Sequence, residues 1–349
     1  MRTVALIKRI CQEMLRDKRT LALLFVAPLL ILSLMYLLFN GDSVKPTLGV
    51  VNIDNTLVKV LEDANITVKE YERATNDTVV EDNLDGLLQM DNENIEMTLQ
   101  NSDPSQATSL QVKVNQAIAA QVQAKLIKDS PLDLKGSHIE TNYVYGSSDT
   151  VFFDVLSPIL IGFFVFFFVF LISGIGLLKE RTTGTLERLM STPIRRGEIV
   201  TAYLVGFGIF AILQTIIIVL YSVSVLDIVL VGSMWNVILI NLLLALVALS
   251  LGILLSSFAA SEFQMVQFIP IVVVPQIFFT GILPLEGMAD WLQSVGKIMP
   301  LYYAADALKA VMYKGQGLGE IQIDLLALVI FAVIFISLNI FALKKYRTL

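Results

Sequence analysis

Residues 179–200 read KERTTGTLERLMSTPIRRGEIV, a short basic segment between two long apolar runs. The preceding run is LSPILIGFFVFFFVFLISGIGLL (156–178), and the following run is TAYLVGFGIFAILQTIIIVLYSVSVL (201–226). Each run is longer than the roughly 20 apolar residues that a helix needs to span a bilayer. The stretch therefore predicts two spanning helices joined by a compact connector, and it decides the class of the whole chain.

The composition of the chain agrees with a membrane protein. Hydrophobic residues make up 55% of the 349 residues and charged residues 16%, whereas soluble domains average roughly 25% charged residues. A single cysteine, Cys11, and a single histidine, His138, exclude an intrachain disulfide and a Cys/His metal cluster. No G-x-x-x-x-G-K-[ST] motif occurs, so we expect no catalytic residue, no bound metal and no ATP hydrolysis by this chain.

Apolar runs along the chain predict six spanning helices. One lies within residues 21–40 and five lie within 151–349. The first run is too long for a signal peptide and lacks an A-x-A-like site, so it predicts a retained anchor. Pro28, Pro270 and Pro275 predict bent helices that their neighbours must support. In chain order, the predicted spans cover about 21–39, 152–178, 199–222, 232–256, 264–284 and 324–343.

Positive charges indicate how these spans are oriented. Lys and Arg cluster in residues 1–20, in 179–196 and in the tail 344–347, and the short loop after the third span holds none. A six-span layout puts the three clusters on one side, and Lys and Arg are enriched on the cytoplasmic side of membranes. We therefore expect a multi-pass protein of the cell membrane, with both termini in the cytoplasm and residues 41–150 outside the cell.

Residues 41–150 carry 18 acidic and 8 basic side chains, which accounts for the net negative charge of the chain. TLGVVNID (47–54), NIEMTLQN (94–101) and SHIETNYVYG (137–146) have strand-like patterns, and residues 105–129 have a helical one. The segment has a normal domain size. The predicted fold class is thus an all-α polytopic membrane protein with six transmembrane helices, plus a small α+β extracellular domain inserted between helices one and two.

The first 20 residues predict an amphipathic helix that lies along the inner surface of the bilayer. Apolar side chains recur at helical spacing, and the basic side chains fall largely elsewhere. Such a helix could serve as an elbow that passes motion into the first span. The simpler alternative is that residues 1–20 are only a positively charged segment that flanks the first span. The predicted apolar face consists of Val4, Ile7, Ile10, Cys11, Met14 and Leu15.

The connector 179–198 also shows helical order. Leu186, Leu189 and Met190 recur at i, i+3 and i+4, with Glu187 and Arg188 on the opposite side. Nearby threonines can cap the helix, and Pro193 ends it. A helix this short is marginal in water, so it needs either the flanking spans or a docking partner. The simpler alternative is a positive connector that only sets topology.

The run ERTTGTLERLMSTP (180–193) resembles the signature loop of ABC-2 type transporter permeases, in the branch with drug- and antibiotic-resistance exporters. The stretch 256–312 is similar to the carboxy-terminal half of that family, in which a span ends at an outer turn followed by an interfacial hairpin. In layout the resemblance covers the whole chain, and the segment between spans one and two matches only in position and size.

The resemblance implies a permease subunit in the lipid bilayer, joined by a second copy or a paralogous permease and by ABC ATPase subunits. ATP and Mg would bind the ATPase, and this chain would bind no cofactor. Residues 180–193 would form the coupling helix, with Gly184 and Thr185 in its Gly-Thr-Leu-Glu core. Glu180 and Arg181 would hold the base of the loop or form an intraloop salt bridge. Its docking face would be Leu186, Leu189 and Met190, with polar contacts from Glu187 and Arg188 and an end at Pro193.

The outer segment 284–312 has two interpretations. One is an ordinary loop with an amphipathic helix, and the other, implied by the resemblance, is a re-entrant hairpin that closes the outer end of the pathway. Trp291 suits the membrane interface. The residues that define the predicted hairpin are Pro284, Gly287, Trp291 and Pro300.

Two classes of function remain open. The first is an ATP-driven exporter that moves a drug, an antibiotic or a lipid-like amphipath out of the cell. The second is a non-transporting membrane receptor or surface protein anchored by six spans. An ion-coupled transporter is disfavoured because the acidic residues lie near predicted span ends. No feature indicates a nucleic-acid partner.

Overall fold

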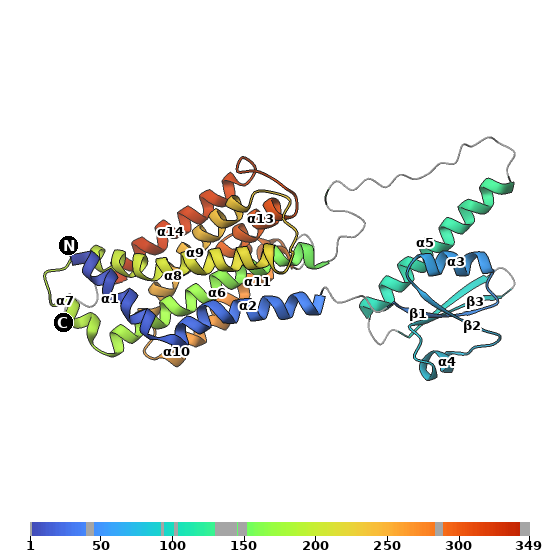
Figure 1. Ribbon diagram of the computed structural model, residues 1–349, viewed down its shortest axis with the longest axis horizontal. Coiled ribbons are helices and arrows are strands. Elements are labelled where there is room, and N and C mark those ends of the chain that lie inside the picture. Colours follow the sequence, from blue (N-terminus) through green and yellow to red (C-terminus); the bar gives the residue numbers. More distant parts are fainter. Residues whose placement is uncertain are drawn as a thin grey trace. The chain divides into compact units, whose positions relative to one another are not determined.

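The computed structural model describes residues 2–39, 45–91, 94–100, 104–129, 145, 152–282 and 289–342. The chain forms two compact units: one combines residues 1–41 with 143–349, and the other contains 42–142. In the described part of the chain, six helices are long and apolar enough to span a membrane, and all belong to the first unit. A four-stranded sheet is inserted between the first two of these helices. This confirms a helical membrane protein with six candidate spans and a small α+β domain between the first two (Figure 1).

Five of the six spans are single helices, and the fifth in order is built from several short pieces. Short helices precede the first span, follow the second and lie between the fifth and the sixth. The single spans are α2 (Lys18–Phe39), α6 (Phe152–Thr182), α8 (Arg196–Ser224), α9 (Met234–Ser256) and α14 (Gln322–Ala342), and the short helices are α1 (Arg2–Arg16), α7 (Thr185–Met190), α12 (Asp290–Gly296) and α13 (Pro300–Met312).

The centre of the helical unit is the close packing of α6 against α9. A Cβ atom on Gly252 of α9 would lie 2.5 Å from the backbone oxygen of Phe170 on α6, so no larger residue fits without moving a helix. Small residues allow such close approach between membrane helices. Asn339 of α14 donates from Nδ2 to the backbone oxygen of Ser250 on α9 at 2.7 Å, which satisfies a buried amide in an apolar layer. α6 and α9 therefore form the core of the bundle, and Asn339 attaches α14 to it.

The fifth span is bent, as its prolines predict. It consists of α10 (Glu262–Phe268), the wide π turn η1 (Ile269–Val273), α11 (Val274–Ile277) and a second π turn, η2 (Phe278–Ile282). Proline lacks the N–H that an α-helix needs, which interrupts the regular bonding of this span. Gln276 donates from Nε2 to the Val272 carbonyl at 2.8 Å. Its Oε1 accepts the Leu301 N–H at 3.3 Å, in the first turn of α13. One buried amide therefore joins the bent span to α13.

The far end of α13 is held by backbone groups from the loop between α8 and α9. The N–H groups of Val231 and Gly232 donate to the carbonyls of Met312 and Val311, at 2.9 and 3.1 Å. A Cβ atom at position 232 would lie 2.5 Å from the Val311 oxygen, so glycine is required there. The last carbonyls of a helix need such outside donors when they are buried.

Helix α1 packs on α8 (Figure 1), and Ile7 and Cys11 are partly buried beside its fully buried side chains. Leu6, Ile10 and Met14 are buried, whereas Val4 and Leu15 are 67% and 61% exposed. The apolar face that was predicted to lie in the bilayer is therefore divided into buried and exposed side chains. The helical spacing of apolar residues shows which side of the helix is apolar, but it does not show whether lipid or protein covers that side. Part of it packs on protein.

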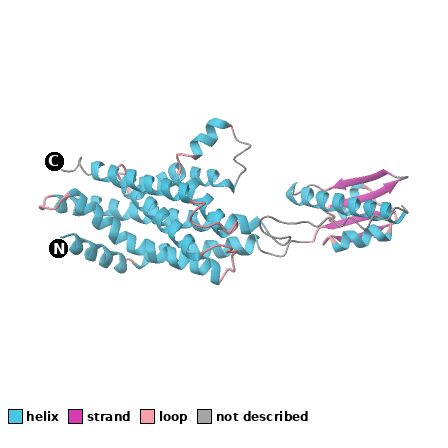
Figure 2. Cartoon of the chain, turned by 90° about the horizontal axis from the view of Figure 1, so that it is seen from above, coloured by secondary structure: helices cyan, strands magenta, loops and turns pink. Residues whose placement is uncertain are grey.

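The strands of the inserted unit (magenta in Figure 2) form one mixed sheet. Their order is β2-β1-β3-β4. β1 pairs in parallel with β2 and β3, and β3 pairs antiparallel with β4. Asp54 caps the helix that follows β1 by accepting the Thr56 N–H at 3.3 Å. The elements are β1 (Thr47–Val51), α3 (Asn55–Asp63), β2 (Thr67–Tyr71), α4 (Asn76–Glu81), β3 (Gly86–Asp91), β4 (Asn94–Leu99) and α5 (Pro104–Asp129).

This unit has its own hydrophobic core. α3 and α5 cover one face of the sheet, where Leu48 and Leu88 meet side chains from both helices, and a smaller cluster with Val79 lies under α4. The predicted extended run 137–146 lies outside the described residues, apart from Tyr145. The main core consists of Leu48, Val50, Leu57, Val58, Leu61, Ile66, Leu88, Leu110, Val114 and Ala117.

Candidate functional site

The segment 180–193 forms a sharp helix–turn–helix connection between α6 and α8. Gly184 has φ 70°, and its amide donates to the Arg181 carbonyl at 3.0 Å, which ends α6. A Cβ atom on Gly184 would meet nothing within 4 Å, so the requirement is conformational, since only glycine adopts this backbone freely. The two-turn helix α7 then begins at Thr185.

The orientation of α7 differs from the predicted one. Leu186 is 1% exposed and belongs to the hydrophobic core of its own chain, and Leu189 and Met190 pack partly against that core. Because α7 lies against the ends of the spans, its apolar stripe stabilises the connector itself. The exposed side chains are Glu187, Arg188, Ser191, Thr192 and Pro193.

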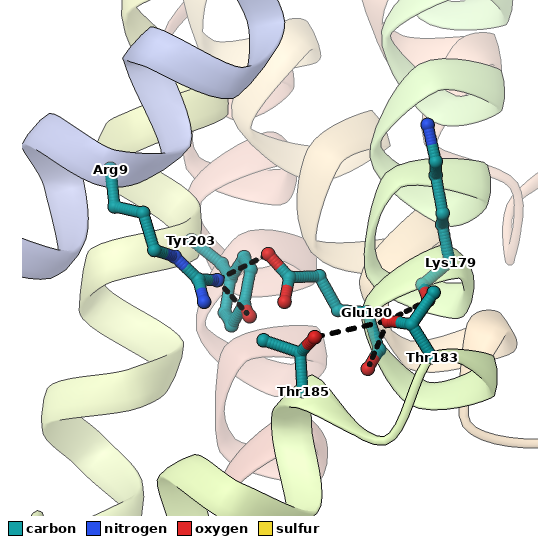
Figure 3. Close-up of polar contacts among 6 residues, drawn as sticks. All are labelled: Arg9, Lys179, Glu180, Thr183, Thr185 and Tyr203. Carbon is teal, nitrogen blue, oxygen red and sulfur yellow. Dashed lines mark hydrogen bonds and ion pairs between the residues drawn. The ribbon is translucent and has the colours of Figure 1, made fainter.

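A buried ion pair fixes the base of this connector (Figure 3). Arg9 of α1 pairs with Glu180 of α6 and also donates to the Tyr203 hydroxyl of α8 at 3.4 Å. Glu180 is 6% exposed, so its charge depends on this partner. Burial lowers the pKa of Arg9, but the attraction of Glu180 and Tyr203 outweighs it and holds that pKa above the ordinary value. Arg9 therefore stays charged.

Arg181 ties the same point of α6 to the end of α9. Its Nη1 donates to the Ser256 carbonyl and, at 3.1 Å, to the Ala259 carbonyl. Charge-assisted bonds to helix-end carbonyls are favourable because those groups lack partners within the helix. The adjacent residues Glu180 and Arg181 thus reach two different neighbours, which supports their predicted place at the base of the loop.

Two further contacts join α1 to the connector. Arg2 donates from Nη1 to the Pro193 carbonyl at 2.6 Å, and Lys179 Nζ lies 3.9 Å from Asp17 Oδ2. Asp17 also accepts from the Thr20 amide and hydroxyl, which caps the start of α2. α1, the connector and the first turn of α2 are therefore linked by side chains.

Of the predicted outer residues, Pro284 and Gly287 lie outside the described part of the chain. Trp291 is an exposed residue of α12, and Pro300 is buried in the first turn of α13. α13 packs against α6 near Gly162, where a Cβ atom would lie 2.7 Å from Leu308. Gly162 and Glu180 lie on one continuous helix, and its rise separates them by about 27 Å. The outer residues are thus remote from the connector.

Sequence reasoning missed the partners of the connector: Arg9, Tyr203, Ser256 and Ala259. Arg9 had a faint signal, because it directly precedes Ile10 in the apolar stripe of α1. Tyr203 had none beyond its place near the start of a span. Two backbone carbonyls leave no trace in the amino-acid sequence.

Comparison with known proteins agrees with this layout. "ABC transporter G family member 20" of Dictyostelium discoideum is 24% identical over 374 residues, covering 98% of this chain and 50% of that protein. "Probable multidrug ABC transporter permease YbhR" of Escherichia coli K12 is 25% identical over 219 residues, covering 62% of this chain and 59% of that protein. "Inner membrane transport permease YhhJ" of the same strain is 27% identical over 177 residues, covering 50% of this chain and 47% of that protein.

The matched regions thus span about half the length of these relatives. A family model described as "ABC-2 family transporter protein" matches residues 18–341, which include all six spans and the connector. The chain belongs to the ABC-2 family of transporter proteins.

Proposed function

We propose that this chain is the permease subunit of an ATP-driven exporter, which moves an amphipathic substrate such as a drug, an antibiotic or a lipid-like molecule out of the cell. A separate ABC ATPase subunit binds ATP and Mg and hydrolyses the nucleotide. A second copy of this chain or a paralogous permease completes the pathway in the bilayer. Family membership and six apolar helices support the permease role.

The observation that carries this proposal is the way α7 is held. Its apolar stripe is anchored in its own chain, and the Arg9–Glu180 pair and the Arg181 bonds join its base to three other helices. A connector that only sets topology needs none of these contacts. A connector that transmits force needs a rigid base, because a flexible one would absorb the movement of its partner.

The contacts define a path for that force. A push on the exposed face of α7 would reach α6 at Glu180, α9 through the carbonyls bonded to Arg181, and α1 through Arg9. From α1 it would pass to α2 at Asp17. On this proposal the partner contacts are polar and involve Glu187, Arg188 and Thr192, whereas Leu186 keeps the helix in place.

The proposed topology places both termini and α7 in the cytoplasm, in the cell membrane, with the sheet unit outside the cell. The three clusters of Lys and Arg support it. Docking of a cytoplasmic ATPase requires α7 on that side, so the two proposals depend on each other.

Charge reversal on α7 tests the proposal. The double variant Glu187→Arg/Arg188→Glu changes only exposed side chains, so the chain should still fold. The matched control reverses Lys314 and Glu320, which are exposed residues of the loop between α13 and α14. We expect the α7 variant to lose co-purification of a Walker-motif ATPase and ATP-driven export in membrane vesicles, and the control to keep both. Equal association and export by both variants would contradict the docking role of α7.

A further inference from the structure

A cavity of about 200 Å³ lies where the junction of α1 and α2 meets α6, α8 and α10. Its walls combine apolar side chains with charged ones, as is usual for pockets that hold small organic molecules. The apolar lining comes from Ile10, Met14, Leu23, Ile172, Ile175 and Phe207, and the charged lining comes from Glu13, Asp17, Lys179, Glu180 and Glu262.

The sign of the charged lining is negative. Four carboxylates face the cavity against the single ammonium group of Lys179. Arg9 balances Glu180, and Lys179 lies 3.9 Å from Asp17. Glu13 of α1 is exposed and hydrogen bonds with Glu180, and Glu262 is exposed at the start of α10. The acidic groups of the lining therefore outnumber the basic groups beside them. The cavity therefore favours a cation.

The lining also indicates the kind of cation. Among the described residues, no group of three acidic, histidine or cysteine side chains is arranged to hold a metal ion. The apolar walls and the ring of Phe207 instead suit an organic group, since an aromatic face attracts a cation and an apolar surface attracts its hydrocarbon part. We propose that this cavity binds a small lipophilic cation, which is the substrate class of the proposed exporter.

The position of the cavity fits such a ligand. Thr20 and Leu23 belong to the first turns of α2, and Lys179 and Glu180 to the last turn of α6. The cavity is thus at the ends of spanning helices, on the side of α7. A lipophilic cation in a bilayer keeps its charge at this depth and its apolar part toward the acyl chains. On the proposed topology, the ligand enters from the inner leaflet.

Binding by the purified full chain, in nanodiscs of zwitterionic phosphatidylcholine and without ATPase, tests this inference. The probe is radiolabelled 1-methyl-4-phenylpyridinium, and its uncharged isostere 4-methylbiphenyl is the competitor. We expect saturable binding of the cation, and weaker binding by roughly tenfold or more in Glu13→Gln/Glu262→Gln. Leu23→Trp keeps every charge but fills the cavity, and should also weaken binding. The matched control Glu320→Gln, remote from the cavity, should bind as the wild type does.

Equal binding of the cation by wild type and Glu13→Gln/Glu262→Gln would overturn the inference, as would equal affinity for the uncharged isostere. A wild-type chain that binds no cation would also overturn the inference. If the double variant then also loses association with the ATPase, the cavity would be assigned to a basic side chain of that partner. Because no ATPase is present in the binding assay, a failed docking role for α7 leaves its result unchanged. The two proposals therefore fail separately.

Discussion

At the scale of single residues, Arg9 and Glu180 form an ion pair that joins α1 to α6. Glu180 is almost fully buried, and Arg9 is about one third exposed. A buried ion pair adds little net stability compared with apolar side chains, but removal of one partner leaves an uncompensated charge. The pair therefore specifies where α1 sits rather than how stable the bundle is.

We predict that Arg9→Gln lowers the free energy of unfolding by about 3 kcal/mol, because Glu180 loses its charged partner. Thermal denaturation of the purified chain in detergent, followed by circular dichroism, measures the effect. The double variant Arg9→Gln/Glu180→Gln should recover part of the loss. Arg16→Gln, an exposed change on the same helix, should stay within about 0.5 kcal/mol of wild type. Equal losses in the Arg9 and Arg16 variants would contradict the buried pair.

Asp17 gives a second prediction, on pH. The hydroxyl and amide of Thr20 hold the pKa of Asp17 below its ordinary value. A carboxylate with a lowered folded-state pKa stabilises the fold above its unfolded pKa, about 3.9, and loses this contribution as the pH falls through the folded value. Asp17→Ala should therefore be less stable than wild type at neutral pH, by roughly 1 kcal/mol.

The difference between Asp17→Ala and wild type should stay constant down to about pH 4 and shrink below it. Paired thermal melts from pH 7 to pH 3 measure this difference. Lys18→Ala, an exposed change at the next position, is the control and should show no such narrowing. A difference that grows as the pH falls would have the wrong sign for a capping carboxylate.

The sequence pattern singled out residues 180–193 but did not predict which residues contact them. Leu186 was predicted to belong to a docking face, and it packs on the core of its own chain. Arg9 and Glu180 are 171 positions apart, and no local pattern reports a contact over that separation. Hydrophobic periodicity predicts that a side chain will be buried, but it does not predict which element packs on it.

At the scale of elements, the crossing of α1 and α8 depends on one glycine. A Cβ atom on Gly206 would lie 2.8 Å from Cγ2 and 3.0 Å from Cβ of Ile10. A Cβ atom on Gly208, two residues further on, would meet nothing closer than 3.8 Å. Alanine at position 206 should crowd α1, whereas alanine at position 208 should not. Comparison of the two variants therefore distinguishes this crowding from the general effect of replacing a glycine within a helix.

We predict that Gly206→Ala pushes α1 away from α8, whereas Gly208→Ala does not. Cys11 reports the shift, because it is partly buried and its Sγ lies 3.9 Å from the Gly206 carbonyl. Burial also raises the pKa of its thiol, which slows its reaction with maleimides. Maleimide labelling should be several-fold faster in Gly206→Ala than in wild type or Gly208→Ala. Equal rates in the two alanine variants would show that the crossing is not tight.

Elements were predicted better than their contacts. All six predicted spans correspond to observed ones, because runs of about 20 apolar residues leave few alternatives. The bend of the fifth span followed from Pro270 and Pro275. Its π turns and the link from Gln276 to Leu301 did not, because they depend on how neighbouring helices satisfy freed backbone groups.

At the scale of the whole molecule, the division into two units leads to a separate prediction. Residues 42–142 contain a complete sheet and their own hydrophobic core. We expect this segment, expressed alone, to be folded and to melt in one cooperative transition by circular dichroism. Leu88→Asp, which buries a charge in that core, should abolish the transition. Val80→Asp, on an exposed site, should keep it. A wild-type segment without a transition would show that the unit depends on the helical part of the chain.

The loop between α8 and α9 has a consequence for the genetics of this protein. It holds the end of α13 through the N–H groups of Val231 and Gly232, and every residue except proline supplies such a group. Alanine scanning would leave these bonds unchanged at position 231 and would record that position as tolerant. Of the two bonded positions, Gly232, where a Cβ atom would reach the Val311 oxygen, would register as sensitive. A scan of side chains would thus report one essential glycine and overlook the joint to which it belongs.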